Sequence, residues 1–329
     1  MSNSIEVSGI QIRSTGGPEV LEWVSFAVPA PARDEVRVRH TAIGVNLIDT
    51  YDRTGLYPMP LPASLGREAA GVVDAVGKGV KGFAVGDRVA YVAQVPGSYV
   101  GARNIKAARL VHVPAGVSDE QAAAVMLKGL TAQYLLRQTY KVRRKDPIVV
   151  TAAAGGVGLL LLQWARHLGA HVIAVVGSDA KVPMALEHGA DDVIVSSRED
   201  MAQRVRELTR GKGVPVVYDS VGKDTFTASL DCLRPRGLMV SYGNASGPVP
   251  PVSLLELSRR GSLFVTRPTL YHYIASRREL DRASRELFDL LERGVLKIVV
   301  GGRHALRDAA APHRDIESRK TVGSLVLVP

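Results

Sequence analysis

The sequence predicts an α/β protein with two domains, one mainly β and one built on a doubly wound parallel sheet. A chain of 329 residues exceeds the size of one ordinary hydrophobic core, and 46% apolar with 22% charged residues is typical of a globular protein. Short β-branched runs broken by Gly and Pro occupy residues 5–113. From Pro147 onward, apolar runs of strand length alternate with segments of helix length.

The first region has the alternating pattern of half-buried strands. In residues 35–39, apolar Val36 and Val38 alternate with arginines, and residues 71–76 form a second β-branched run. Such alternation predicts an antiparallel or barrel-like sheet with one buried face. Residues 46–51, which lie between these two runs, are expected to form a strand-to-loop segment.

The second region begins with a helix and then alternates strands with helices. The acidic segment 118–121 predicts the start of a helix that continues to Leu136. Nearly continuous apolar runs follow, as a parallel sheet with helices on both faces requires. These predicted strands are 148–151, 171–176, 192–195, 214–218 and 237–242.

The segment after Arg267 is too short for a third domain. It predicts helices over 278–292 and 306–317 and strands at 298–300 and 324–328. The simplest placement returns this segment to the mainly-β domain. The predicted domains are therefore residues 1–125 with 267–329, and residues 126–266.

Composition excludes several classes of protein. Cys232 is the only cysteine, so neither an intrachain disulfide nor a zinc site with two thiolates can form within one chain. No leader peptide and no apolar run long enough to span a bilayer is found, which favours a cytoplasmic protein without membrane insertion. The net charge is +10, but the basic residues are scattered, so a nucleic-acid partner is not expected.

A glycine turn joins the first strand of the second region to a helix. Gly155, Gly156, Val157 and Gly158 lie between the apolar strand 148–151 and the helical segment 159–168. Backbone N–H groups and a helix dipole in this order suit the diphosphate of a dinucleotide. Glycines that serve only the turn or helix packing are the alternative, and the second strand at a βαβ distance favours the dinucleotide.

The end of that second strand favours NADPH over NADH. A 2′-phosphate requires small hydroxyl and cationic partners, which Gly177, Ser178 and Lys181 offer. Asp179 is the objection, because a carboxylate at this place is typical of NAD-preferring sites. A role in the first turn of a helix would keep it away from the ribose.

With these features, the sequence resembles the NADPH quinone oxidoreductases related to ζ-crystallin, a zinc-free group of the medium-chain dehydrogenases/reductases. The resemblance covers essentially the whole chain and is strongest to the bacterial quinone reductases. It implies a GroES-like domain formed from both chain ends and interrupted by a Rossmann domain. The matching blocks are NLIDTY at 46–51, GLYP at 55–58, LKGLT at 127–131, AAAGGVG at 152–158, YDSVG at 218–222, RGLMV at 236–240, VTRP at 265–268 and ESR at 317–319.

The resemblance also implies a set of site residues. Asn46, Asp49 and Tyr51 would line the nicotinamide and substrate cleft between the domains, as the catalytic residues. A homodimer is implied as well, and the apolar strand 262–266 is the interface candidate. The implied cofactor contacts are Asn46, Thr131, Tyr134, Gly155, Gly156, Val157, Gly158, Gly177, Ser178, Lys181, Ser196, Ser220, Tyr242, Gly243 and Asn244, with Arg267 and Arg319 from across the cleft.

One position departs from the family. Where such reductases often have a tyrosine near the adenosine phosphate, this chain has Ser196, followed by Ser197 and Arg198. Ser196 can donate a hydrogen bond and Arg198 can supply charge, but aromatic stacking is lost. We therefore expect weaker NADPH affinity than in the family.

The residues that bind zinc in related alcohol dehydrogenases are missing from this sequence. The block that carries a histidine ligand there is Gly66, Arg67 and Glu68 here, and an arginine stays protonated at neutral pH. We expect no metal, and a structural ion-pair or hydrogen-bond role for Glu68.

Without a metal, hydride acceptance by a quinone is easier than oxidation of an alcohol, because a conjugated acceptor delocalises the incoming charge. Tyr51 would donate a hydrogen bond to a quinone oxygen. The expected function is thus NADPH-dependent, metal-independent quinone reduction. The alternatives are reduction of activated C=C bonds in enones, RNA binding as a second role, and a purely structural role.

Overall fold

The computed structural model describes residues 4–318 and 321–329. The chain forms two compact units, the first made of Met1–Leu130, Ile274–Glu292 and Ile298–Pro329 and the second of Thr131–Tyr273 and Arg293–Lys297. These bounds differ from the predicted domains at residues 126–130, 267–273 and 293–297. The reasons are local contacts: the Tyr273 ring stacks on Tyr134, and the Gln163 side chain bonds to the backbone of Lys297 at both its N–H and its C=O.

A mainly antiparallel sheet forms the first unit. Its strand order is β14-β15-β3-β4-β5-β7, with β6 paired to β3, and β1 pairs separately with β2. Within the described part of this sheet, β14 and β15 are the only pair that runs parallel. The strands are β1 (Ile5–Gln11), β2 (Glu22–Val28), β3 (Glu35–Val45), β4 (Glu68–Val76), β5 (Arg88–Val92), β6 (Ala102–Lys106), β7 (Leu110–His112), β14 (Val300–Ala305) and β15 (Ser324–Val328).

Two predictions for this unit need correction. The strand predicted at 298–300 is β14, which begins at Val300 and continues through Gly301 and Gly302, because pairing with β15 carries it past the glycines. The segment 46–51, predicted as strand-to-loop, leads into helix α1 (Leu47–Thr54). An Asp49 carboxylate that accepts from the Asn46 backbone N–H starts this helix, and Gly55 ends it at a φ of 80°.

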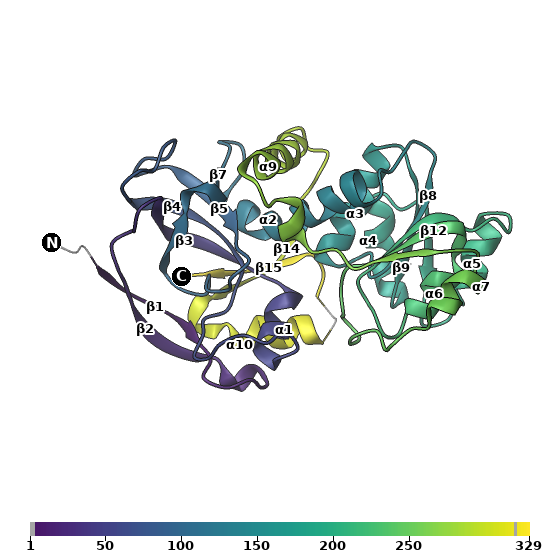
Figure 1. The fold of residues 1–329 in the computed structure, drawn as a ribbon, viewed down its shortest axis with the longest axis horizontal. Helices are drawn as coiled ribbons and strands as arrows, with labels where there is room; N and C mark the ends of the chain where they lie inside the picture. The colour runs from purple at the N-terminus through teal and green to yellow at the C-terminus, as the bar shows by residue number, and fades with distance from the viewer. Residues whose placement is uncertain (1–3, 319–320) are drawn as a thin grey trace. The chain divides into compact units, whose positions relative to one another are not determined.

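Two long helices belong to the first unit: α9 (Arg277–Glu292) and most of α2 (Asp119–Tyr134). Its other helical segments are short: α10 (Ala310–Glu317) and the 3-10 turns Pro18–Val20, Ala107–Arg109 and Leu306–Asp308. The helix predicted over 306–317 is therefore a 3-10 turn followed by α10. In Figure 1, α1 and α10 lie next to each other, and their residues are in contact.

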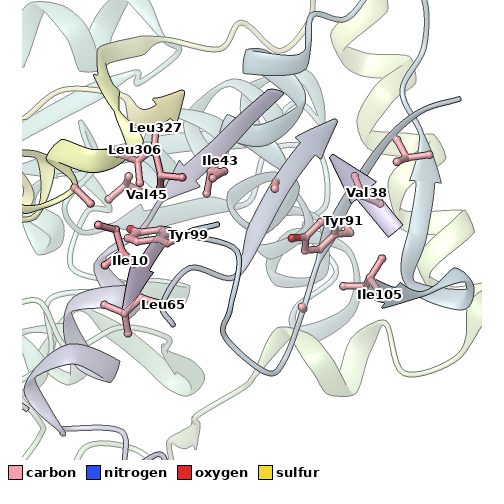
Figure 2. Close-up of a cluster of buried hydrophobic side chains, with 14 of the residues drawn as sticks. Ile10, Val38, Ile43, Val45, Leu65, Tyr91, Tyr99, Ile105, Leu306 and Leu327 are labelled. Carbon is pink, nitrogen blue, oxygen red and sulfur yellow. The ribbon is translucent and has the colours of Figure 1, made fainter. Parts of the chain in front are cut away.

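The core of the first unit joins segments distant in sequence. Figure 2 shows Ile10, Leu65 and Tyr99 beside Leu306 and Leu327. All five side chains are at most 1% exposed. Burial at this level stabilises a fold by about 1.5–3 kcal/mol for each large apolar side chain. The C-terminal strand thus completes the first unit, as the sequence predicted.

A six-stranded, fully parallel sheet forms the second unit. Its order is β10-β9-β8-β11-β12-β13, which is the 3-2-1-4-5-6 order of a Rossmann fold. This confirms the predicted fold class. The strands are β8 (Pro147–Val150), β9 (His171–Val176), β10 (Asp192–Val195), β11 (Val214–Asp219), β12 (Leu233–Ser241) and β13 (Phe264–Thr266).

Helices cover both faces of this sheet. Figure 1 shows α3 and α4 on one face and α5 and α6 on the other. The helices are α3 (Gly156–His167), α4 (Val182–Glu187), α5 (Met201–Leu208), α6 (Phe226–Asp231), α7 (Leu254–Arg259) and α8 (Leu270–Tyr273), with a 3-10 turn at Asp179–Lys181. None of the helices in the described residues is both long enough and apolar enough to cross a membrane.

The helix predicted up to Leu136 ends differently. After α2 the chain forms a π-helical turn over Leu135–Thr139. The Tyr218 hydroxyl, from β11, donates to the Leu135 carbonyl at 3.1 Å. The Leu135 carbonyl also accepts from the Tyr140 N–H at 3.2 Å, five residues along the chain, so the Tyr218 hydroxyl is a second donor that supports the π-helical turn.

Candidate cofactor and substrate site

The turn from β8 to α3 has the shape that a diphosphate needs. Gly155 donates its N–H to the Ala152 carbonyl at 2.9 Å, and Ala152 has a φ of 46°. A Cβ on Gly158 would lie 2.5 Å from the carbonyl oxygens of both Ala152 and Ala153, so only glycine fits there. The first N–H groups of α3, from Gly156 onward, have no acceptor within the helix and lie at its positive end.

Small and cationic side chains follow the ends of β9, which neighbours β8 in the sheet, and of β10, which neighbours β9. Gly177 is exposed, and a Cβ there would meet nothing within 4 Å. Ser178 precedes the 3-10 turn that contains half-buried Lys181, and partial burial lowers the pKa of the Lys181 ammonium. Ser196 donates its hydroxyl to the Val176 carbonyl at 3.2 Å, which places the turn after β10 beside the end of β9.

Asp179, the carboxylate that argues against NADPH, forms an ion pair with Arg198. Both Nε and Nη2 of Arg198 lie near its Oδ1, at 3.1 and 3.0 Å. Asp179 is the first residue of the 3-10 turn that follows Ser178, as a first-turn role requires. The carboxylate therefore has a cationic partner within the same group of loops.

A buried carboxylate, Asp219, organises the loop after β11. It accepts hydrogen bonds from the backbone of Val221 and Gly222 at 2.8 and 3.1 Å and from the hydroxyls of Thr225 and Ser229, both at 2.6 Å. The loop presents Ser220, whose N–H donates to the Thr151 hydroxyl at 3.1 Å. Asp219 was not predicted in this role, although a carboxylate at a strand end before Gly222 is a signal for a loop anchor.

The loop after β12 is held by Arg267. Its Nη1 donates to the carbonyls of Ser241 at 2.9 Å and Gly243 at 3.3 Å, and its Nη2 donates to the Asn244 amide oxygen at 3.0 Å. A Cβ on Gly243 would lie 2.4 Å from the Ser220 carbonyl, so this close approach requires glycine. The Tyr242 hydroxyl is shielded from solvent, and burial raises its pKa.

Arg267 therefore belongs to the second unit, not to the mainly-β part in which the sequence placed it. It buttresses a strand-end loop of the Rossmann unit. Arg319 lies outside the described residues, so its expected contact remains a prediction.

Two predicted cofactor residues come from α2. Thr131 is 8% exposed and Tyr134 is 3% exposed, and the Tyr134 ring stacks on Tyr273 with centroids 4.4 Å apart. Burial raises the pKa of the Tyr134 phenol, so it stays protonated at every physiological pH. The Tyr273 hydroxyl accepts from Thr139 at 3.1 Å, which ties α8 to the π-helical turn.

Asn46 and Asp49 in the first unit are part of a buried polar cluster. The Asn46 N–H donates to Asp49 Oδ2 at 2.8 Å, and its side-chain amide donates to Glu68 Oε1 at 2.7 Å. Glu68 also accepts from the Lys128 ammonium at 3.3 Å and from the Leu127 N–H at 2.6 Å. Since Glu68 is fully buried, these contacts confirm its structural ion-pair role.

Asp49 is inaccessible, with 0% exposure. The Tyr99 hydroxyl donates to its Oδ2 at 3.0 Å, and its Oδ1 has no hydrogen-bond partner among the described residues. Desolvation, and next the nearby Asp52 charge, raise the pKa of Asp49 from 3.8 to about 7. A side chain so placed acts on Asn46 and α1; its expected contact with a substrate stays a prediction.

A hydrogen-bond chain continues from Asp49 toward α10. His313 Nε2 lies 3.1 Å from the Tyr99 hydroxyl, and His313 Nδ1 lies 3.0 Å from Arg53 Nη1. Because arginine only donates, the imidazole proton resides on Nε2 and points at the Tyr99 oxygen. Burial, then the Arg53 charge, lower the His313 pKa to about 3, so it is neutral. Neither Tyr99 nor His313 was predicted, since no local motif marks them.

Tyr51 lies on the exposed side of α1. It is half-buried and meets the Tyr57 ring edge-on, with centroids 5.4 Å apart. Of the three predicted catalytic residues, it alone has substantial exposure. Tyr51 is therefore better placed than Asn46 or Asp49 to reach a ligand from solvent.

Arg67, at the position of the zinc-binding histidine, forms a buried ion pair. Its Nε and Nη2 donate to the two carboxylate oxygens of Asp52 at 2.9 and 2.7 Å. The Asp52 side chain is 1% exposed and that of Arg67 10%. In the described part of the chain, no three His, Cys, Asp or Glu side chains are grouped so that they could hold a metal ion.

Two family descriptions match the chain, each along one of its regions. Residues 32–145 match the alcohol dehydrogenase GroES-like domain, and residues 156–292 match the zinc-binding dehydrogenase family. A quinone oxidoreductase of Pseudomonas aeruginosa is 54% identical over 321 residues, which are 97% of this chain and 99% of that protein. The chain belongs to the quinone oxidoreductase family of the medium-chain dehydrogenases/reductases.

Further family members extend the comparison. A structure of Escherichia coli quinone oxidoreductase complexed with NADPH superimposes with a TM-score of 0.96 at 51% identity, covering 98% of this chain and 100% of the other. A 2-haloacrylate reductase of Burkholderia sp is 48% identical over 326 residues, 97% of this chain and 98% of that protein. Members of this family are thus named for two activities, quinone reduction and 2-haloacrylate reduction.

Proposed function

We propose that the chain is an NADPH-dependent quinone oxidoreductase. The observation that carries this proposal is the group of strand-end loops in the second unit, where the Gly158 turn adjoins the loops of Ser178 and Lys181 in a Rossmann strand order. The family relatives named quinone oxidoreductase, one of them solved with NADPH, support the same assignment.

The residues present fit a dinucleotide phosphate. The Gly158 turn leaves no room for a Cβ and directs the first N–H groups of α3 to one place, which suits a diphosphate. Ser178 and Lys181, with Ser196, offer hydroxyls and a cation for a 2′-phosphate. Ser220, Tyr242 and the Gly243–Asn244 loop line the adjacent strand ends. When bound, NADPH supplies the hydride for the reduction.

In the first unit, we propose that Tyr51 donates a hydrogen bond to the acceptor oxygen and that Asn46 orients the ring. Asp49 and Glu68 position Asn46, since each holds one of its N–H groups. Substitution Tyr51→Phe tests this role. We expect a lower kcat with quinones, and an unchanged rate with every quinone would remove Tyr51 from the mechanism.

We propose that the reaction needs no metal. Arg67 occupies the position of a metal ligand, and its guanidinium stays charged and paired with Asp52. Activity that survives dialysis against a chelator is the expected result. Loss of activity on chelation, restored by zinc, would overturn the proposal.

The direct test is NADPH consumption, followed by absorbance with a panel of quinones. We expect quinone-dependent oxidation with a higher kcat/KM for NADPH than for NADH. No turnover with any quinone would refute the proposed activity. The second candidate is reduction of an activated C=C bond, which the 2-haloacrylate reductase favours. A kcat/KM for 2-haloacrylate or an enone above that for every quinone would select it.

We further propose a homodimer formed through β13, in a cytoplasmic protein. Within the described sheet β13 is an end strand, and Phe264 and Val265 on it are 61% and 40% exposed. Leu254 on α7, in the same unit, is 80% exposed. An edge strand with one side open for pairing and with apolar side chains suits a twofold contact with a second copy. Phe264→Glu should give a monomer in sedimentation, and a monomeric unmodified chain would refute the dimer.

A further inference from the structure

We propose that Arg198 sets the preference of this chain for NADPH over NADH by masking the Asp179 carboxylate. This inference rests on the proposed function and adds a specificity-determining ion pair to it. The group concerned consists of Asp179 and Lys181 after β9 and Arg198 after β10.

Asp179 has the place of a carboxylate that selects NADH. It follows Gly158 by 21 residues and lies just past the end of β9. In Rossmann sites an acidic residue about 20 residues after the glycine turn accepts from the ribose 2′-hydroxyl. Left alone, the Asp179 charge would repel a 2′-phosphate and would offset Lys181.

The fold brings Arg198 to this carboxylate. The Ser196 N–H donates to the Val176 carbonyl at 2.9 Å, and the Arg198 N–H donates to the Val195 carbonyl at 3.0 Å. The first bond holds the turn after β10 against the end of β9, and the second closes the turn itself. Two guanidinium nitrogens then converge on one oxygen of Asp179, at 3.1 and 3.0 Å.

Neighbouring acidic groups do not replace Asp179 as the partner. Arg198 Nη1 lies 3.5 Å from Glu199 Oε1, but that oxygen also accepts from the Val195 N–H at 2.8 Å. The other Glu199 oxygen lies 3.4 Å from Arg204. Glu199 is thus held on its own side of the turn.

The consequence of the pair is expected in the charge that it leaves at the site more than in folding. The side chains are 57% and 70% exposed, so solvent screens the attraction between the two charges and the pair adds little to stability. With the pair formed, Asp179, Lys181 and Arg198 together carry one net positive charge. Removing Arg198 leaves no net charge and an unmasked carboxylate at the ribose end.

A double-mutant cycle tests the proposal by calorimetric binding of NADPH, NADH and adenosine 2′,5′-bisphosphate. Arg198→Gln should weaken NADPH and the bisphosphate about 10-fold and change NADH by less than about 2-fold, because repulsion between a 2′-phosphate and an unmasked carboxylate near the protein surface has this size. Adding Asp179→Asn should return NADPH affinity to within about 3-fold of the parent, since the carboxylate to be masked is then gone.

The controls separate the ion pair from overall charge. Lys212→Gln removes one positive charge at the opposite end of the parallel strands, just before β11 begins, and should leave all three affinities unchanged. The Arg198→Gln effect should shrink at high salt.

Two results would overturn the proposal: equal NADPH affinity of Arg198→Gln and parent, or a double variant as weak as Arg198→Gln. If the parent chain binds neither NADPH nor NADH, the proposed function fails instead.

Discussion

Substitution of Asp49 by Asn should change how the stability of the first unit depends on pH. The Asp49 carboxyl is fully buried, and its pKa is raised from 3.8 to about 7. Between these values the folded chain retains a proton that the unfolded chain has released. The unfolding free energy therefore falls as pH rises through this window and stops falling above about pH 7.

The size of the effect follows from the two pKa values. From pH 5 to pH 8, ionisation of a group with these pKa values lowers the unfolding free energy by about 2.5 kcal/mol. The amide introduced by Asp49→Asn would carry no such cost, while its oxygen can still accept from Asn46 and Tyr99. The stability of Asp49→Asn relative to the parent should thus rise by about 2.5 kcal/mol over this range, or about 5–10 °C in Tm.

Thermal unfolding of both proteins at pH 5, 6, 7 and 8 measures this difference. Subtraction at each pH cancels buried groups that both proteins share, such as His40 and His313, whose pKa values burial lowers to about 4 and about 3. Val85→Ala, at a position that is 68% exposed in the same unit, is the control and should show a constant difference, because it changes no titratable group. A constant difference for Asp49→Asn as well would refute the buried, proton-retaining carboxyl.

Three further results are expected. Gly158→Ala should lower stability by about 1–3 kcal/mol and weaken NADPH binding, because its Cβ would lie 2.5 Å from two carbonyl oxygens; Gly177→Ala, with open space, should keep parental stability in the same melt. Asp52→Asn should cost about 3 kcal/mol in chemical denaturation, since it removes the carboxylate charge that faces the buried Arg67 guanidinium, and a loss below about 1 kcal/mol would contradict this. Tyr218→Phe should loosen the π-helical turn, seen as faster amide exchange at 135–140, and unchanged exchange would show that the hydroxyl does not hold it.

The sequence predicted the elements whose signal is local. The strands at 171–176 and 324–328 match β9 and β15, because each is an apolar run bounded by turn residues. The end of α2 was not predictable in this way, since the Tyr218 hydroxyl that holds the π-helical turn comes from a strand far along the chain. Helix α1 did carry a local signal, the Asn46 and Asp49 capping pair, which the strand-to-loop prediction overlooked.

The candidate site likewise has one part with a local sequence signal and one part that depends on contacts between distant segments. The glycine turn and the Ser178–Lys181 segment follow one another in sequence, so their chemistry was visible. Asp179 was an objection that sequence could not resolve, because its partner Arg198 is supplied by the turn after the next strand. Arg267 was assigned to the wrong part of the chain for the converse reason, as its partners are carbonyls of the loop after β12.

The buried charges around Arg67 explain why one substitution would not restore a metal site. A histidine in place of Arg67 would leave the Asp52 carboxylate, 1% exposed, without its cation. The adjacent Glu68 is already bound by Asn46 and Lys128, and Cys232 is the only cysteine. The cost of an unpaired buried charge is about 3–5 kcal/mol, which a metal would have to offset with one new ligand. The arginine that replaces the metal ligand is also the partner of a buried carboxylate. A return to zinc chemistry therefore requires several coordinated changes in this unit.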